Sequence, residues 1–234
     1  MGRAWPLFGA LGVMLAMGSA AAAQQPVVVE LFTSEGCSSC PPADRLLATL
    51  AERPGILVLS FDVDYWDRLG WKDPFSSAAA TARQHDYARL LEIGSVYTPQ
   101  IVVDGRWQVV GSDSGAVEKA LVAARRAPPP ISVSLVVEDG RARVGFGATG
   151  GVHAFLLLVA FDRHDTDNVV RGENAGRTLT HVDVVRGFGK IARSDGTPQT
   201  IEVPIAWPGN RLAALLQADD GRVLGAAVVD LDRD

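Results

Sequence analysis

The sequence predicts an α/β domain over residues 24–127, followed by a smaller antiparallel all-β domain, a sandwich or barrel, over residues 131–234. Apolar runs typical of buried strands alternate with helical periodicity in the first part. In the second part, short apolar runs are separated by glycine-containing turns. Three prolines at 128–130 separate the two parts, because consecutive prolines donate no backbone hydrogen bonds and favour an extended linker.

The elements expected in the first domain each follow from a local pattern. Runs rich in β-branched residues favour strands, and apolar residues at positions 43, 46, 47 and 50 have the spacing of one helix face. Ser76 or Ser77 is suited to cap the second helix, and Asp104-Gly105 is typical of a tight hairpin turn. In chain order we expect strand 27–32, a helix around 43–50, strand 56–63, helix 76–91, hairpin strands 101–103 and 107–110, and helix 117–126.

The second domain has the turn spacing of successive hairpins. Residues 141–146 alternate polar and apolar side chains, which predicts a strand with one face in water. Residues 154–161 form an unbroken apolar run of a length typical of a buried strand. Turn signals stand at 139–140, 150–151, 195–196, 208–209 and 220–221.

Residues 1–23 have the pattern of a secretory signal peptide. Arg3 is followed by an apolar stretch, and three alanines precede Gln24 as a small-residue cleavage site. The alternative is an uncleaved anchor, although the apolar stretch is shorter than a membrane-spanning helix requires. We therefore expect an exported protein, periplasmic or secreted, with no membrane span after signal cleavage, in a compartment where disulfides persist.

The composition excludes several classes of function. The chain has 22 Lys and Arg against 27 Asp and Glu, a net charge of −5, and this acidic balance argues against binding to nucleic acid. Two cysteines exclude a disulfide-dense scaffold and a four-thiolate zinc site. The four histidines show no clustered spacing, so we expect no metal site and no cofactor.

The two cysteines are Cys37 and Cys40, separated by two serines, between the first strand and the first helix. The positive end of a helix dipole favours a thiolate there, which lowers the pKa of the first cysteine. We expect Cys37 to be the exposed, attacking thiol and Cys40 to resolve the mixed disulfide. Pro41 and Pro42 follow, and prolines are tolerated in the first turn of a helix.

Two further features are expected near this pair. Thr98-Pro99 directly precedes the strand at 101–103, and a cis proline there would be a positional feature. Trp66 and Trp71 follow the second strand, at the sheet edge where open α/β sheets bind ligands. Either the two tryptophans form a platform for a polypeptide or thiol partner, or they only pack their loop onto the domain.

This order of strands, helices, cysteine pair and Thr-Pro dipeptide resembles the thioredoxin fold. More narrowly, the chain resembles an exported bacterial family catalogued as a domain of unknown function, number 1223. The segments that carry this resemblance are ELFTSEGCSSCPPAD (30–44), DYWD (64–67), LGWKDPF (69–75), VYTPQ (96–100), GEN (172–174) and GRTL (176–179).

The thioredoxin resemblance implies that Pro99 is cis and faces the cysteine pair, with Thr98 and Pro99 lining the contact with a partner. The chain departs from well-known thioredoxin-like enzymes, which often bury a carboxylate six residues before the first cysteine. Leu31 occupies that place, and Glu30 points to the opposite face of the strand. Asp62 or Asp64 is a substitute from the neighbouring strand, and Glu35 would oppose thiolate formation if it lies close.

Three functions stay open for the cysteine pair. The first is thiol-disulfide exchange with protein thiols or disulfides by an oxidoreductase, because a bridge closing so short a loop adds little stability. The second is a non-catalytic binding or assembly protein with a structural disulfide, whose β domain holds an unidentified protein partner. The third is a copper metallochaperone that binds copper(I) on two thiolates.

Overall fold

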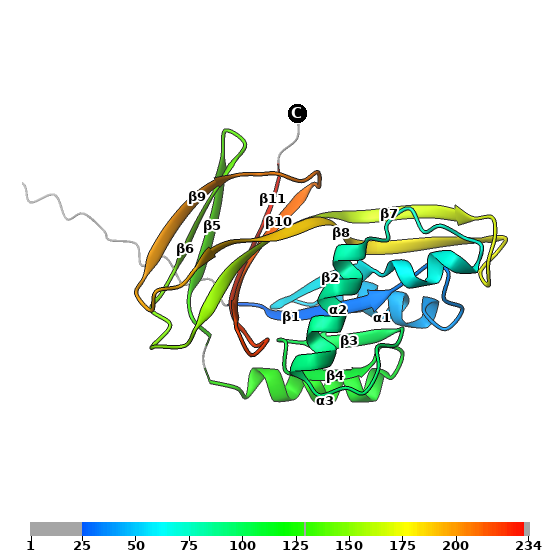
Figure 1. The fold of residues 1–234 in the computed structure, drawn as a ribbon, viewed down its shortest axis with the longest axis horizontal. Coiled ribbons are helices and arrows are strands. Elements are labelled where there is room, and N and C mark those ends of the chain that lie inside the picture. Colours follow the sequence, from blue (N-terminus) through cyan, green and yellow to red (C-terminus); the bar gives the residue numbers. More distant parts are fainter. Residues whose placement is uncertain (1–24, 129, 232–234) are drawn as a thin grey trace, which may run out of the picture.

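The computed structural model describes residues 25–128 and 130–231. The predicted signal peptide lies outside the described residues. The protein has a mixed α/β architecture, with one large sheet of eight strands and a small antiparallel sheet of three (Figure 1). No helix among the described residues has the length and apolar character needed to cross a membrane.

The elements follow the sequence pattern closely up to the prolines. They are β1 (Val27–Thr33), α1 (Pro41–Ala51), β2 (Ile56–Asp62), the 3₁₀ helix η1 (Asp64–Leu69), α2 (Ala78–Leu90), β3 (Gln100–Val103), β4 (Trp107–Val110) and α3 (Ser114–Arg125). Every strand and helix expected in this part is present, with ends shifted by a few residues. The element that the pattern did not predict is η1, which follows β2 directly.

The side chains of β1 and β2 alternate between two buried faces, so helices cover the sheet on both sides. On one face Leu31 and Val58 pack against α1 and α3. On the other, Phe32 and Phe61 pack against Tyr87 of α2. Because both faces are covered, the two strands are nearly continuous apolar runs, as in other buried sheets.

Side-chain caps and turns explain where several elements start and end. Ser77 accepts a hydrogen bond from the backbone N–H of Ala80 at 3.1 Å, which confirms one of the two expected caps of α2. Asp104 and Gly105 both have positive φ angles, of 45° and 63°, as the tight turn between β3 and β4 requires. A Cβ atom on Gly105 would lie 1.9 Å from the carbonyl oxygen of Gly221, so only glycine fits there.

The strands after the prolines are divided between the two sheets, which corrects the expected self-contained sandwich or barrel. They are β5 (Val133–Glu138), β6 (Arg141–Phe146), β7 (Ala154–Val169), β8 (Arg177–Arg193), β9 (Gln199–Pro204), β10 (Arg211–Ala218) and β11 (Val223–Asp230). Strand β8 pairs with β2 at Ser60 and Val184, so β7, β8, β10 and β11 extend the sheet of the first segment. The order in the large sheet is β11-β10-β7-β8-β2-β1-β3-β4, and in the small sheet it is β5-β6-β9. The expected domain boundary at 128–130 stays a prediction.

The buried run in β7 shows why the second segment needs two sheets. Phe155, Leu157 and Val159 face the core that contains α2. The alternating residues Leu156 and Leu158 face a second core, formed with the three-stranded sheet. Because both faces of β7 are apolar, the small sheet has to cover the face that the helices leave free.

The second half of β7 is polar and pairs with the first half of β8 as a long hairpin. Its tip, residues 170–176, extends toward the end of β1 (Figure 1). The hairpin therefore carries residues of the second segment to the loop that contains the two cysteines.

Candidate functional site

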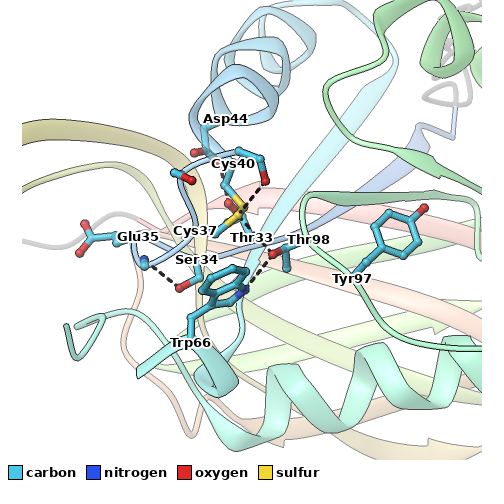
Figure 2. The surroundings of a disulfide bond; sticks show 12 residues. Thr33, Ser34, Glu35, Cys37, Cys40, Asp44, Trp66, Tyr97 and Thr98 are labelled. Carbon is cyan, nitrogen blue, oxygen red and sulfur yellow. Dashed lines mark hydrogen bonds between the residues drawn. A yellow bond between two sulfur atoms is a disulfide. The ribbon is translucent and has the colours of Figure 1, made fainter. Parts of the chain in front are cut away.

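Cys37 and Cys40 form a disulfide in the loop between β1 and α1 (Figure 2). Their Cα atoms are 5.4 Å apart, a separation typical of disulfides. Cys40 is the N-cap residue of α1, and Pro41 and Pro42 occupy the first helical positions, where no intrahelical partner for an N–H is lost. The loop therefore sits at the positive end of a helix dipole, as the sequence predicts.

Cys37 contacts the segment that precedes β3, sixty-one residues further along the chain. The Thr98 hydroxyl donates a hydrogen bond to Cys37 Sγ at 3.3 Å, and Trp66 Nε1 donates to Thr98 Oγ1 at 2.8 Å (Figure 2). The Thr98–Pro99 peptide bond is cis, and Pro99 is buried. Cys37, Thr98, Pro99 and Trp66 therefore meet in one place.

The expectation that Cys37 is exposed is wrong, because its relative solvent exposure is 0%. The tip of the β7–β8 hairpin is hydrogen-bonded to the same loop. The Asn174 side-chain amide donates to the carbonyl oxygens of Glu35 at 2.8 Å and Cys37 at 3.0 Å. The Glu173 carboxylate accepts a hydrogen bond from the backbone N–H of Ser38 at 3.0 Å.

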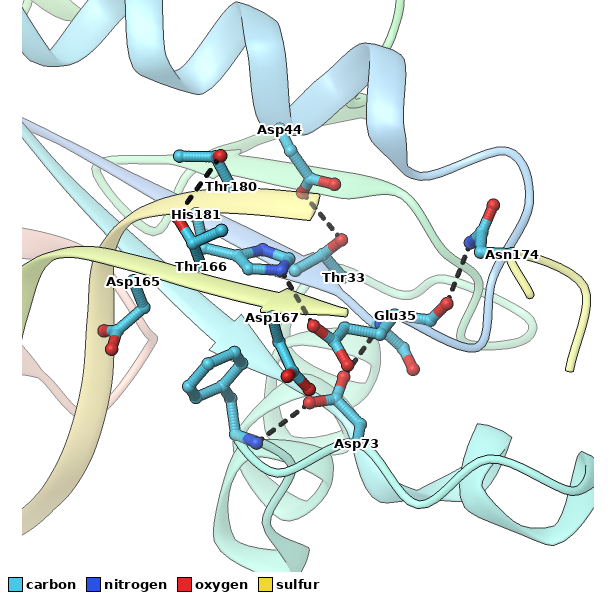
Figure 3. Close-up of polar contacts among 12 residues, drawn as sticks. Thr33, Glu35, Asp44, Asp73, Asp165, Thr166, Asp167, Asn174, Thr180 and His181 are labelled. Carbon is cyan, nitrogen blue, oxygen red and sulfur yellow. Dashed lines mark hydrogen bonds and ion pairs between the residues drawn. The ribbon is translucent and has the colours of Figure 1, made fainter. Parts of the chain in front are cut away.

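Glu35, two residues before Cys37, is fully buried and is held by the loop between η1 and α2 and by β8 (Figure 3). Its carboxylate accepts a hydrogen bond from Trp71 Nε1 at 2.7 Å and lies 3.2 Å from His181 Nε2 of β8. Its backbone N–H donates to the Asp73 carboxylate at 2.8 Å. Trp71 is therefore a partner of this carboxylate, whereas Trp66 contacts Thr98.

Asp62 and Asp64 point in different directions, although only one residue separates them. Asp64 accepts a hydrogen bond from the Thr81 hydroxyl of α2 at 2.6 Å. Asp62 lies opposite Thr33 in the β1–β2 register, and the Thr33 hydroxyl donates to Asp44 of α1 at 2.9 Å. Asp62 therefore shares the α1 face of the sheet with the cluster, whereas Asp64 is tied to α2.

Glu35, Asp44, Asp62, Asp73 and His181, which we call the acidic cluster, are all buried. Burial raises the pKa of Asp44 and of Asp73 to about 6. Burial, together with the charge of Asp73, raises the pKa of Asp62 well above its ordinary value. Burial works against a charged His181, but the hydrogen bond with Glu35 and the charges of Asp62 and Asp44 outweigh it and raise the pKa of His181 to about 9.

The acidic cluster was not predicted as a unit. Asp44, Asp73 and Asn174 stand inside segments that carry the family resemblance, and this was the available sequence signal. His181 lies outside those segments, and no spacing connects it with the cysteines. Within residues 25–128 and 130–231, no group of three or more His, Cys, Asp or Glu side chains is arranged to hold a metal ion.

The fold and the site define a mixed α/β protein with a buried disulfide between a strand and a helix N-terminus. The chain belongs to the family described as "Protein of unknown function (DUF1223)", whose model matches residues 28–217. This confirms the family resemblance.

Two solved structures are similar over most of the chain. A crystal structure of a protein from Agrobacterium tumefaciens is 31% identical, covers 90% of this chain and 96% of its own, and has a TM-score of 0.78. HBP35 of Porphyromonas gingivalis is 14% identical, covers 90% of this chain and 76% of its own, and has a TM-score of 0.64, a likeness of fold alone. No curated protein matches the chain.

Proposed function

We propose that the protein is an exported thiol-disulfide oxidoreductase with a thioredoxin-like first domain, in which Cys37 and Cys40 are the redox-active pair. Export rests on the signal-peptide pattern of residues 1–23. The substrates are thiols or disulfides of other proteins in a compartment where disulfides persist.

The observation that carries the proposal is the hydrogen bond from the Thr98 hydroxyl to Cys37 Sγ at 3.3 Å. It joins the cysteine pair to the residue before a cis proline, far away in the sequence. A disulfide with a purely structural role between residues three apart needs no such partner. A donor on Cys37 Sγ stabilises a thiolate, which is the reactive form of a cysteine.

The exchange reaction uses both cysteines in turn. The Cys37 thiolate attacks one sulfur of a partner disulfide, which forms a mixed disulfide and releases the other partner sulfur as a thiolate. Cys40 then attacks Cys37, so the Cys37–Cys40 bond forms and the second partner sulfur leaves. The partner is reduced by two electrons and the protein is oxidised by two. With an oxidised protein and a reduced partner the same steps run in reverse.

The first test is the reduction potential of the protein without residues 1–23, measured by equilibration with thiol buffers. A potential above about −270 mV with rapid exchange is expected for a catalytic pair, whereas one below about −300 mV with slow exchange contradicts the proposal. Cys37→Ser should abolish exchange with a protein disulfide, and Cys40→Ser should accumulate mixed disulfides. Ser38→Ala, in the same loop, is the matched control and should retain exchange.

Trp66 tests where a protein partner contacts the site. Trp66 is half-buried and donates a hydrogen bond to Thr98. We propose that Thr98, together with Pro99, lines the contact with a protein partner. Trp66→Ala should slow exchange with a protein disulfide more than exchange with a small dithiol, because only the larger partner extends over the indole. Trp107→Ala, on β4, is the control. Equal slowing of both reactions by Trp66→Ala would exclude a platform.

A second candidate is a binding or assembly protein with a structural disulfide and an unidentified partner of the second segment. The complete burial of both cysteines favours it, because a catalytic thiol has to reach its partner. The potential measurement separates the two candidates. The third function, a copper metallochaperone, requires that the reduced protein binds copper(I) stoichiometrically and that Cys37→Ser abolishes this binding.

A further inference from the structure

The end of η1 with the loop after it, residues 68–72, and the tip of the β7–β8 hairpin, residues 170–177, form one surface beside the cysteine loop. A Cβ atom on Gly172 would lie 3.2 Å from Trp71 Cβ, so the two segments are in contact. Both also contact Glu35, two residues before Cys37. Trp71 Nε1 donates to the Glu35 carboxylate at 2.7 Å, and the Asn174 amide donates to the Glu35 carbonyl oxygen at 2.8 Å. The two segments therefore border the place where a partner of Cys37 has to dock.

This surface, which we call the basic surface, has a charge opposite to that of the whole chain. It contains four basic residues and one acidic residue, a net charge of +3, whereas the chain carries −5. The four basic side chains are all exposed, and they belong to Arg68, Lys72, Arg171 and Arg177. Within residues 25–128 and 130–231, none of the four forms an ion pair with a carboxylate. Their positive charges are therefore available to a partner.

The carboxylates next to the basic surface are bonded to neutral groups of the protein. Asp67 accepts a hydrogen bond from the Ser76 hydroxyl at 2.9 Å. Asp167, near the end of β7, accepts one from the backbone N–H of Asn168 at 2.8 Å. Neither carboxylate pairs with one of the four cations, so both reduce the positive potential of the surface without neutralising a single side chain.

One carboxylate of the chain itself already binds between the basic surface and the cysteines. Glu173, at the hairpin tip, accepts a hydrogen bond from the backbone N–H of Ser38 at 3.0 Å, and Ser38 lies between the two cysteines. Hydrogen bonding by Ser38 lowers the pKa of Glu173, so the charged form of this side chain is favoured. The cysteine loop therefore offers a backbone donor to a carboxylate, at the end of a helix where a negative charge is stabilised.

Two large apolar side chains are also exposed on the basic surface. Leu69 is 48% exposed and Val170 is 67% exposed. Apolar side chains with charged and polar groups around them are typical of surfaces that bind proteins. A small anion would leave both side chains in water, so a polypeptide fits this surface better.

We propose that the basic surface binds an acidic polypeptide segment of the partner protein, and that this contact selects which disulfides or thiols reach Cys37. The inference rests on the proposed function, because it names the substrate class of the same cysteine pair. Carboxylates of the segment face the four cations, and one of them takes the place of Glu173 at the Ser38 N–H when the hairpin tip lifts. Leu69 and Val170 contact apolar side chains of the same segment.

The test uses the protein without residues 1–23 and two peptides of equal length that contain the same disulfide. Glutamates flank the disulfide in one peptide, and lysines flank it in the other. The rate at which the reduced protein reduces each peptide is measured at low and at high salt. The variant is Lys72→Glu with Arg171→Glu. The matched control is Lys119→Glu with Arg125→Glu, which changes the net charge equally at two exposed residues of α3.

At low salt the native sequence should reduce the acidic peptide at least about 10-fold faster than the basic one, because opposite charges speed association by about 10- to 1000-fold. This ratio should fall toward one at high salt, where exposed charges are screened. The Lys72→Glu, Arg171→Glu variant should lose or reverse the preference, and the control should keep it. A loosened cysteine loop would change both rates by the same factor and leave their ratio unchanged.

Equal rates with the two peptides in the native sequence overturn the proposal, and so does a double variant that keeps the native ratio. Should the variant not fold, the salt dependence of the native sequence is decisive, since a preference that high salt leaves unchanged is not electrostatic and overturns the proposal. Binding to vesicles of phosphatidylglycerol together with equal peptide rates would identify a membrane surface as the partner instead.

Failure of the proposed function is distinguished by two further peptides, in which serines replace the cysteines. If neither disulfide peptide is reduced but the acidic serine peptide binds more tightly than the basic one, the proposed function is wrong and the docking surface is supported. If there is no exchange and both serine peptides bind equally, both proposals are overturned.

Discussion

Replacing Asn174 tests whether the hairpin tip keeps Cys37 buried. The Asn174 amide donates to two carbonyl oxygens of the cysteine loop, at 2.8 and 3.0 Å, and the residue is 0% exposed. Each hydrogen bond contributes about 0.5–1.5 kcal/mol net, so Asn174→Ala should favour opening of the loop by about 1–3 kcal/mol. Because about 1.4 kcal/mol corresponds to a tenfold change in an equilibrium, the open population should rise about 5- to 150-fold.

The assay is the rate at which dithiothreitol reduces the disulfide of the native protein, since attack on Cys37 requires the open loop. The rate should increase by the same factor as the open population. Asn168→Ala is the matched control, because Asn168 is an exposed asparagine of the same hairpin. Urea unfolding of each variant shows whether global unfolding contributes. An unchanged rate for Asn174→Ala would refute the role of the hairpin tip in covering Cys37.

Two further predictions concern stability. Arg83 forms an ion pair with Glu30 at 2.5 Å, and the two side chains are 9% and 1% exposed. Arg83→Met should lower the free energy of unfolding in urea by about 3–5 kcal/mol, because it leaves the buried charge of Glu30 unpaired. A decrease below about 1 kcal/mol contradicts this. Burial raises the pKa of Asp44 to about 6, above its value in the unfolded chain, so ionisation of Asp44 destabilises the fold as the pH rises through this range. Asp44→Asn should therefore have little effect near about pH 4 and stabilise by about 1–3 kcal/mol near about pH 7.5, and equal effects at both pH values would count against it.

Local patterns predicted the elements of the first segment because their signals lie within a few residues. Strands β1 and β2 are apolar on both faces, and Ser77 caps α2. The pairing of β8 with β2 depends on a contact between residues far apart, at Ser60 and Val184, and neither strand carries a local mark of it. The second half of β7 also lacks a buried-strand pattern, because it pairs with β8 while most of its side chains are exposed or only partly buried.

In the site too, local sequence signals were predictive and contacts between distant residues were not. The spacing of Cys37 and Cys40 predicted the disulfide position, and the out-of-phase position of Glu30 predicted that it points away from the cysteine loop. In the structure Glu30 does face α2, where it pairs with Arg83. The contact between His181 and Glu35 joins residues 146 positions apart, so only the path of the β7–β8 hairpin brings them together.

The cysteine loop is held from both segments, and this links the state of the disulfide to the position of the hairpin. Thr98 of the first segment contacts Cys37 Sγ, and Asn174 of the second binds the carbonyl oxygen of the same residue. If lifting the hairpin tip exposes Cys37 to a partner, then a partner bound to Cys37 must favour the lifted tip by the same free energy, because coupling between two equilibria is reciprocal. The second segment is therefore part of the redox site as we propose it, because its hairpin sets how much of the protein presents Cys37 at any moment.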